Sequence, residues 1–364
     1  MKRTMNLLLA AVLLLVAAVA LVWALNVRDE SAIANVEAIP ASSEMIARGA
    51  YLARAGNCMA CHTTRGGEPY AGGRAIETPF GAVYTSNLTP NEQSGIGSWT
   101  AEHFWRAMHN GRSKDGRLLY PAFPYTNTTR VTREDSDALF AYLRSLPAVF
   151  NPNRDHALQF PFNSQAALAV WRALYFKPGV YQPDAARNAE WNRGAYLVQG
   201  LGHCSACHAA RNALGATTAG AGLAGGLIPV QNWYAPSLTS PHEAGMADWD
   251  TQEIVNLLQN GVSKNASVAG PMAGVVLGST QYLTPDDLAA MAQYLKQLPP
   301  STTVKPQASS AAGSAAGAKL YEQHCAGCHG IQGDGVPNAY PALAGNRAVT
   351  MPQIANLVQI VAGA

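Results

Sequence analysis

Charged residues are scarce in this sequence. Asp, Glu, Lys and Arg make up 13% of the 364 residues, and the formal net charge is +2. Proteins that bind nucleic acid present a strongly basic face, so we expect no nucleic-acid partner. The glycine-rich fingerprints of flavin and nucleotide sites are absent too, so chemistry that needs those cofactors must reside in another chain.

Cysteine is also rare, with six in the chain. All six fall in three copies of the pattern C-x-x-C-H: Cys58-Met-Ala-Cys61-His62, Cys204-Ser-Ala-Cys207-His208 and Cys325-Ala-Gly-Cys328-His329. This pattern attaches c-type haem: the thiols form thioethers to the vinyl groups, and the histidine ligates the iron. A zinc site would need second ligand pairs nearby, and a disulfide framework would not place a histidine after every second cysteine. We therefore expect three haem c groups.

A long uncharged run occurs at the amino end, from Leu7 to Leu25, after Lys2 and Arg3. As a helix it would span roughly 28 Å, about the hydrocarbon core of a bilayer. The basic residues keep the amino end in the cytoplasm, so the rest of the chain is exported. We expect residues 1–30 to anchor the chain in the bacterial inner membrane, with its haem domains facing the periplasm. A cleaved signal peptide is the alternative, although no clean A-x-A site follows.

The chain repeats itself. Arg48-Gly-Ala-Tyr51-Leu52 precedes the first haem motif, and Arg193-Gly-Ala-Tyr196-Leu197 precedes the second. Each copy then has a helical stretch that opens at a tryptophan and closes at a glycine, and a closing helix with a threonine N-cap and a proline stop. These landmarks are Trp99, Gly111, Thr132 and Pro147 in the first copy and Trp249, Gly261, Thr284 and Pro299 in the second.

The repeat predicts a mainly α chain with three class I cytochrome c-like haem domains in tandem. Domain 1 covers residues 40–150, domain 2 residues 185–299 and domain 3 residues 318–364. Residues 300–317 are rich in small residues and are expected to form a flexible linker. The third domain has no counterpart of the closing helix, so we expect it to be truncated at Ala364.

The sixth ligand of haem iron is usually methionine. Gly270-Pro271-Met272-Ala273 lies between Gly261 and the second closing helix, where a distal methionine would face the haem. We expect Met272 to complete the coordination of haem 2, although it could instead be a loop residue that fills a gap.

The other two haems lack such a methionine. Phe123 stands at the corresponding place in domain 1, and phenylalanine cannot bind iron. Haem 1 is therefore five-coordinate or uses another ligand, with Met108 as the tentative choice and His109 and His103 as alternatives. Met351 of domain 3 precedes a predicted helix, so we expect the ligand of haem 3 to lie in a segment that this sequence lacks.

Other residues are predicted to position the proximal histidines. Pro236-Ser-Leu238 and Pro341-Ala-Leu343 are typical of a turn whose proline carbonyl accepts a hydrogen bond from the histidine Nδ1. In domain 1 the carbonyl of Ser86 takes this place. The remaining histidines are interpreted as surface or loop residues: His156, His203, His242 and His324. His203 and His324 directly precede Cys204 and Cys325, so each is also a minor candidate for bis-histidine ligation.

Taken together, these features resemble the triheme cytochrome c subunits of bacterial membrane-bound dehydrogenases. The resemblance extends from about residue 40 to the end and is carried by Arg-Gly-Ala-Tyr-Leu, Tyr-Pro-Ala-Phe-Pro-Tyr, Gly-Pro-Met-Ala, Ser-Thr-Gln-Tyr-Leu-Thr and Gly-Asp-Gly-Val-Pro. The family's partners are periplasmic alcohol, aldehyde, gluconate or sorbitol dehydrogenases, which are quinoproteins or flavoproteins, and molybdenum hydroxylases such as nicotinate dehydrogenase. The loop that contains Phe123 is more similar to that of the molybdenum hydroxylase branch of the family, whereas the version with methionine is typical of the alcohol and gluconate branch.

The resemblance implies an electron-transfer subunit rather than an enzyme. Electrons would pass from the catalytic partner through the haems to ubiquinone or a terminal oxidase. Two alternatives remain open: a peroxidase-like enzyme that acts at an open haem 1, and a haem subunit of a terminal oxidase.

Overall fold

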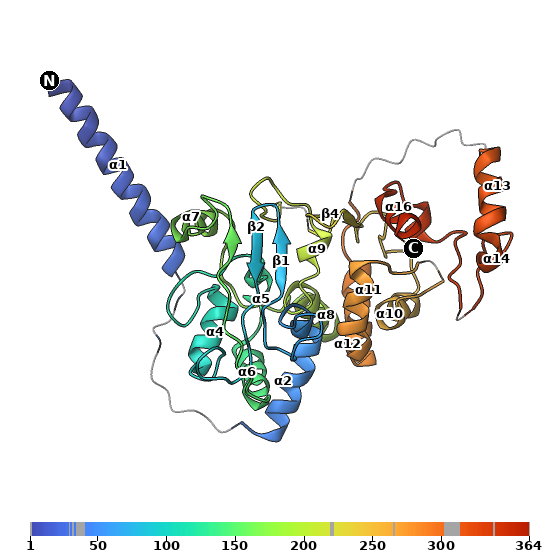
Figure 1. Cartoon of the computed structure of the whole chain (residues 1–364), viewed down its shortest axis with the longest axis horizontal. Coiled ribbons are helices and arrows are strands. Elements are labelled where there is room, and N and C mark those ends of the chain that lie inside the picture. Colours follow the sequence, from blue (N-terminus) through green and yellow to red (C-terminus); the bar gives the residue numbers. More distant parts are fainter. Residues whose placement is uncertain are drawn as a thin grey trace. The chain divides into compact units, whose positions relative to one another are not determined.

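The computed structural model describes residues 2–28, 30, 33, 41–218, 222–264, 266–301, 314–337 and 339–363 (Figure 1). The chain is mainly helical, as predicted, and divides into two compact units. Unit 1 contains residues 1–50 and 61–181, and unit 2 contains residues 51–60 and 182–364. Most of the expected linker and the terminal Ala364 lie outside the described residues, and the predicted domain boundaries remain predictions.

Unit 1 combines helices with a small antiparallel sheet of order β1-β2-β3, in which Ile76 pairs with Val83 and Ala82 with Ala157. This sheet was not expected from the sequence. The elements are α1 (Lys2–Val27), α2 (Ser43–Ala55), α3 (Cys58–Cys61), β1 (Ala75–Thr78), β2 (Gly81–Tyr84), α4 (Ala101–Asn110), α5 (Tyr125–Thr128), α6 (Arg133–Ser145), β3 (Ala157–Leu158) and α7 (Gln165–Tyr175). Of these, α2 and α3 are divided between the two units.

Unit 2 is also helical and contains one two-stranded antiparallel sheet, β4-β5. Its elements are α8 (Ala189–Gln199), α9 (Ser205–His208), β4 (Gly226–Ile228), β5 (Trp233–Ala235), α10 (Thr251–Asn260), α11 (Pro271–Gly278), the 3₁₀ helix η1 (Thr280–Tyr282), α12 (Pro285–Lys296), α13 (Ala315–His324), α14 (Ala326–His329), α15 (Arg347–Thr350) and α16 (Ala355–Ala362).

The repeated Arg-Gly pair makes the same helix crossing in both units. In unit 1, α2 crosses α6 at Gly49, where an added Cβ would lie 1.9 Å from the carbonyl oxygen of Ala138. In unit 2, α8 crosses α12 at Gly194, where an added Cβ would lie 1.9 Å from the carbonyl oxygen of Ala290. Glycine is therefore required at both positions, because only a residue without Cβ lets the two backbones approach this closely.

The arginine before each glycine stabilises the helix crossing through an ion pair. Arg48 donates to Asp135 at 2.7 Å, and Arg193 donates to both carboxylate oxygens of Asp287, each at 2.7 Å. Each aspartate stands one turn after a threonine that caps the closing helix, and its backbone N–H donates to that threonine. The predicted N-caps are thus confirmed.

The central helices of the two units also match the prediction. α4 ends at Gly111 with φ 58°, and α10 ends at Gly261 with φ 76°. Both glycines are in the left-handed region that commonly terminates helices. The helices begin at Ala101 and Thr251, two residues after the tryptophans that were expected to open them.

The charge pair in unit 2 predicts a specific response to acid. Burial alone would raise the pKa of Asp287, but hydrogen bonds from Arg193 and Tyr51 and the charge of Arg193 outweigh it, so the pKa lies below its ordinary value of 3.8. Its stabilising contribution is therefore present above that value and is lost as the pH falls through the lower, folded-state pKa. Asp287→Asn should cost about 1.5–3 kcal/mol at pH 7, the range for hydrogen bonds to charged groups.

Guanidinium denaturation at several pH values measures this effect. We expect the difference between wild type and Asp287→Asn to shrink below pH 3.8. Asp286→Asn, an exposed change on the same helix, is the control and should leave stability nearly unchanged. Equal stabilities of wild type and Asp287→Asn at pH 7 would contradict the prediction.

The part of the chain from residue 314 onward has little core of its own. Among its described residues, Met351 is the one buried apolar side chain. The segment instead packs on the rest of unit 2: Asn356 exchanges two hydrogen bonds with the backbone of Tyr234 in β5, at 2.8 and 2.7 Å. Asn346 donates to Ser267 at 3.1 Å.

Candidate haem sites

The three histidines of the C-x-x-C-H motifs share one geometry. The Nδ1 of His62 lies 2.7 Å from the carbonyl oxygen of Ser86. The Nδ1 of His208 lies 2.7 Å from that of Pro236, and the Nδ1 of His329 lies 2.9 Å from that of Pro341. All three carbonyl contacts that the sequence predicted are confirmed. Since Nδ1 donates to a carbonyl, the lone pair is on Nε2, as haem iron requires.

Burial favours the neutral form of the imidazoles at the first two sites. It lowers the pKa of His62 and His208, although the hydrogen bonds to the carbonyls of Ser86 and Pro236 oppose the shift. The neutral imidazole is the form that can ligate iron. Burial also raises the pKa of the Cys204 thiol to about 12, which fits an apolar cavity.

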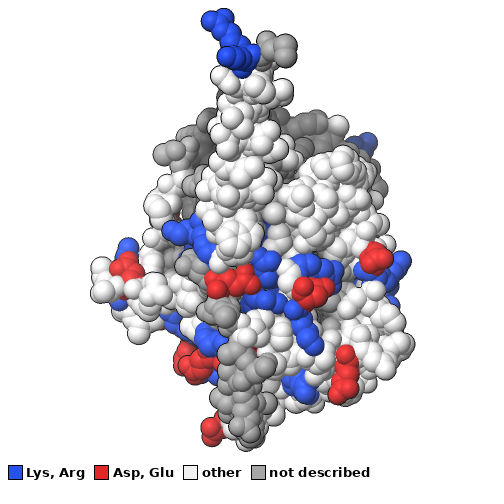
Figure 2. Space-filling model, turned by 90° about the vertical axis from the view of Figure 1, so that its left-hand side faces the viewer, with Lys and Arg blue, Asp and Glu red and all other residues white. Residues whose placement is uncertain are grey.

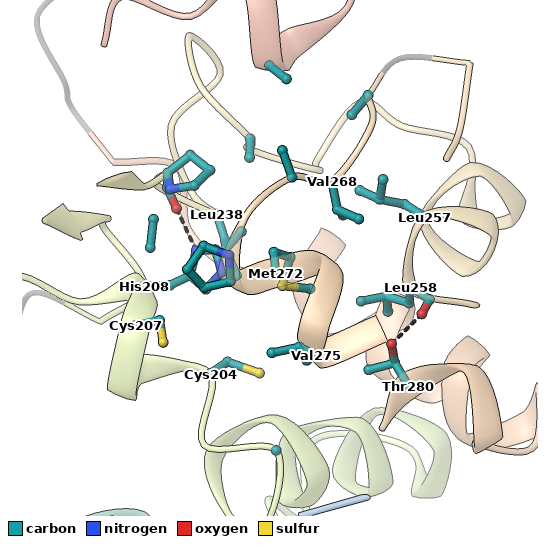
Figure 3. Close-up of a pocket in the computed structure, with 18 of the residues that line it drawn as sticks. Cys204, Cys207, His208, Leu238, Leu257, Leu258, Val268, Met272, Val275 and Thr280 are labelled. Carbon is teal, nitrogen blue, oxygen red and sulfur yellow. Dashed lines mark hydrogen bonds between the residues drawn. The ribbon is translucent and has the colours of Figure 1, made fainter. Parts of the chain in front are cut away.

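A large apolar cavity surrounds His208 in unit 2. Cys204 and Cys207 line it together with Met272, and Figure 3 shows these side chains directed into the same space. Much of the remaining wall is aliphatic and includes Leu197, Ile228, Leu238, Leu257, Val268 and Val275. Two thiols, an oriented imidazole and a thioether in an apolar cavity are the groups that covalent haem needs, so the residues fit this cofactor.

Four methionines line this cavity: Met246, Met272, Met291 and Met351. Met272 follows Pro271 in the first turn of helix α11, where the sequence analysis had expected a loop, so that expectation was wrong. Met246 and Met291 are buried with the other apolar side chains of unit 2. The other three methionines of the cavity are therefore alternatives to Met272. The role of Met272 as the iron ligand remains a prediction.

Met351 lies in the cavity of His208, only 6% exposed, and not with the third haem motif. It was expected not to ligate haem 3. Arg347, Asn356 and Ile360 line the same cavity, so the last part of the chain closes part of its wall. The sequence did not indicate this contact, because α16 is separated from His208 by the whole third motif.

His203 was interpreted as a surface or loop residue, and it does lie in a loop, but that loop is part of the cavity wall. His203 lines the cavity of His208, and its Nε2 lies 3.3 Å from the carbonyl oxygen of Gly56. Ala55 and Asn57, the residues on either side of Gly56, line the cavity as well. The segment that leads into the first haem motif is therefore part of the wall of the second site.

Met108 occupies the position in α4 that Leu258 occupies in α10. Thr128 donates through its hydroxyl to the carbonyl of Met108, and Thr280 donates in the same way to that of Leu258. Leu258 lines the cavity of His208. The repeat therefore gives Met108 the position of a cavity-lining residue at haem 1, and ligation by Met108 remains a prediction.

Both alternative histidines of domain 1 have structural contacts. The Nδ1 of His103 accepts from the backbone N–H of Thr100 and completes a capping box at the start of α4. The Nδ1 of His109 lies 2.8 Å from the carbonyl oxygen of Thr129, and its ring stacks on Trp105 with centroids 4.5 Å apart. His109 thus has the same Nδ1–carbonyl geometry as the proximal histidines, whereas His103 is used as a cap.

The comparison with known proteins agrees with this geometry. The family model named cytochrome c matches residues 46–147, 192–299 and 314–360, which is more than half of the chain. The chain belongs to the cytochrome c family. Each matched region of this cytochrome contains one C-x-x-C-H motif.

Several relatives of the cytochrome are components of dehydrogenases. A nicotinate dehydrogenase component of Pseudomonas putida is 41% identical over 331 residues, which cover 88% of this chain; the chain spans 27% of that protein. The cytochrome c subunit of the quinone alcohol dehydrogenase of Komagataeibacter europaeus is 39% identical, covering 88% of this chain and 73% of the relative. The gluconate 2-dehydrogenase cytochrome c subunit of Pantoea cypripedii is 37% identical, covering 84% and 73%.

These relatives confirm the resemblance to dehydrogenase cytochrome subunits. The protein is an electron-transfer cytochrome of the haem c type. When bound, haem c supplies an iron that alternates between the ferrous and ferric states. The cysteines of this chain would hold the group, and its apolar side chains would exclude water. Backbone carbonyls orient the histidines that would ligate the iron.

Proposed function

We propose that the chain carries three haem c groups and passes electrons from a periplasmic dehydrogenase to ubiquinone or a terminal oxidase. The observation that carries the proposal is the common geometry of His62, His208 and His329, each bound through Nδ1 to a backbone carbonyl. A disulfide or zinc function would not require this orientation three times. The names of the relatives support a catalytic partner that oxidises an alcohol, a sugar acid or a nitrogen heterocycle.

We propose also that α1 remains attached as the membrane anchor. It is 26 residues long, is the one described helix long and apolar enough to cross a membrane, and its apolar part is not buried in the protein. Its last turn supports retention, because Asn26 is buried and accepts a hydrogen bond from the buried Arg172 at 2.9 Å. Cleavage after α1 would leave this guanidinium without that partner. The haem domains then lie on the periplasmic side of the inner membrane.

Purification from solubilised membranes tests the partner. A tag on this chain should retain a dehydrogenase catalytic subunit, and addition of that enzyme's substrate should reduce the haems. Retention of a copper-haem oxidase subunit alone would favour the terminal-oxidase alternative. Rapid oxidation of the reduced cytochrome by peroxide with turnover would favour the peroxidase-like alternative at haem 1.

Haem counting tests the number of cofactors. We expect three haems per chain from mass spectrometry and from the absorbance of the pyridine complex. Replacing Cys325 and Cys328 by serine should reduce the count to two. A count of two haems in the wild type would contradict the prediction of a third haem site, while the proposal for the other two sites would stand.

A further inference from the structure

The outward face of α7 is apolar where an ordinary surface helix would be polar. The helix contains two polar residues, Gln165 and Arg172, and Arg172 is only 3% exposed. Val170 and Leu174, one turn apart, are 47% and 65% exposed. A helix that is hydrophobic all round is usually buried in a protein core or in a membrane. The exposed face of α7 therefore indicates a surface that is covered by another apolar environment, either lipid or protein.

α7 is bonded to the end of α1. The side-chain amide of Asn26 donates to the carbonyl of Ala169 at 2.9 Å, and Arg172 donates to the side-chain oxygen of Asn26 at 2.9 Å. Arg28, just after α1, donates to the carbonyl of Phe176 at 2.5 Å. In Figure 1, α7 lies at this end of α1, and the remainder of α1 extends away from the other elements of unit 1. The helix is thus held at the level where the apolar run of α1 ends.

The surroundings of this contact have the chemistry of a lipid–water interface. Trp23 of α1 is 67% exposed, and Tyr175 at the end of α7 is exposed as well. Tryptophan and tyrosine are enriched where membranes meet water. Figure 2 shows Lys and Arg side chains gathered around the foot of α1, with some acidic side chains among them. Cationic side chains at this level are attracted to anionic lipid headgroups.

We propose that the outward face of α7 lies in the lipid–water interface of the leaflet at which α1 ends. Val170 and Leu174 would enter the headgroup region, and unit 1 would be held against the bilayer at two points. A single spanning helix leaves a domain free to tilt about its junction, whereas the additional contact of α7 limits that motion. The inference rests on the proposed anchoring by α1. The alternative is that a second protein chain covers the outward face of α7.

Depth-dependent quenching tests the proposal on the full-length holoprotein. Leu174→Cys introduces a free thiol on an exposed side chain, while haem attachment would occupy the six native cysteines. An environment-sensitive fluorophore on this thiol is measured in vesicles of phosphatidylethanolamine and phosphatidylglycerol that carry nitroxide quenchers near the headgroup or near the chain end. Ser145→Cys, at the end of α6, is the exposed control, and α6 lies away from α1 in Figure 1. Leu14→Cys, in the middle of α1, reports on the anchor.

We expect the Leu174 probe to shift to the blue and to lose most of its fluorescence to the headgroup-level quencher, while the Ser145 probe changes in neither respect. An unquenched Leu174 probe would overturn the proposal. Its emission wavelength would then distinguish a probe exposed to water from one in an apolar site covered by a second protein chain. Quenching of the Leu14 probe by the deep nitroxide is expected if α1 spans the membrane. A failure of the Leu14 probe alone would refute the anchor and leave α7 as an independent interfacial helix.

Discussion

Replacing Gly194 by alanine is expected to disrupt unit 2. The added Cβ would lie 1.9 Å from the carbonyl oxygen of Ala290 and 2.5 Å from its carbonyl carbon. Both atoms belong to the backbone of α12, so no side chain can rotate away and the two helices must separate. Overpacking of this kind costs about 1–3 kcal/mol and occasionally more, and we expect the upper end of that range or beyond.

Guanidinium denaturation followed by circular dichroism measures the loss, and the haem count reports whether the second site still matures. Gly274→Ala is the matched control: it also lies in a helix, its Cβ would meet no atom within 4 Å, and alanine there should add up to about 1 kcal/mol of helix propensity. Gly49→Ala should resemble Gly194→Ala, because its Cβ meets Ala138 in the same way. If Gly194→Ala were as stable as Gly274→Ala, the close crossing of α8 and α12 would be refuted.

Replacing Met272 by leucine is expected to remove the sixth ligand of haem 2 with little change in volume. The haem should become five-coordinate, lose the charge-transfer band of ferric methionine ligation and bind carbon monoxide. Loss of the thioether should lower the reduction potential by on the order of 0.1 V, within the roughly 0.8 V that axial ligands span. Optical spectroscopy and potentiometric titration measure both effects.

The other methionines of the cavity supply the controls. Met246→Leu and Met351→Leu change side chains that line the same cavity and should leave the band and the carbon monoxide response as in the wild type. If Met351→Leu lost the band while Met272→Leu kept it, the ligand would come from the last part of the chain. The assignment of Met272 would then be wrong.

The repeat was readable because its landmarks act locally. A threonine cap, a terminating glycine and an arginine–aspartate pair depend on spacing along the chain, and the structure has them where the pattern predicted. The β-strands were missed because each is two to four residues long, too short to show alternation. α7 was missed because its apolar residues surround the helix instead of forming one stripe, although Ser164 marks its start as an N-cap.

By itself, the sequence predicted where haem would be attached and which residue would be the proximal ligand, because two thiols and an imidazole must lie within five consecutive residues. It also determined the carbonyl partner of each histidine, since the turn that provides it is a short motif. Only the tertiary structure decided what surrounds His208: Ala55 and Asn57 come from the segment before the first motif and Met351 from the segment after the third. Contacts between such distant segments depend on how helices pack, and no spacing along the chain records them.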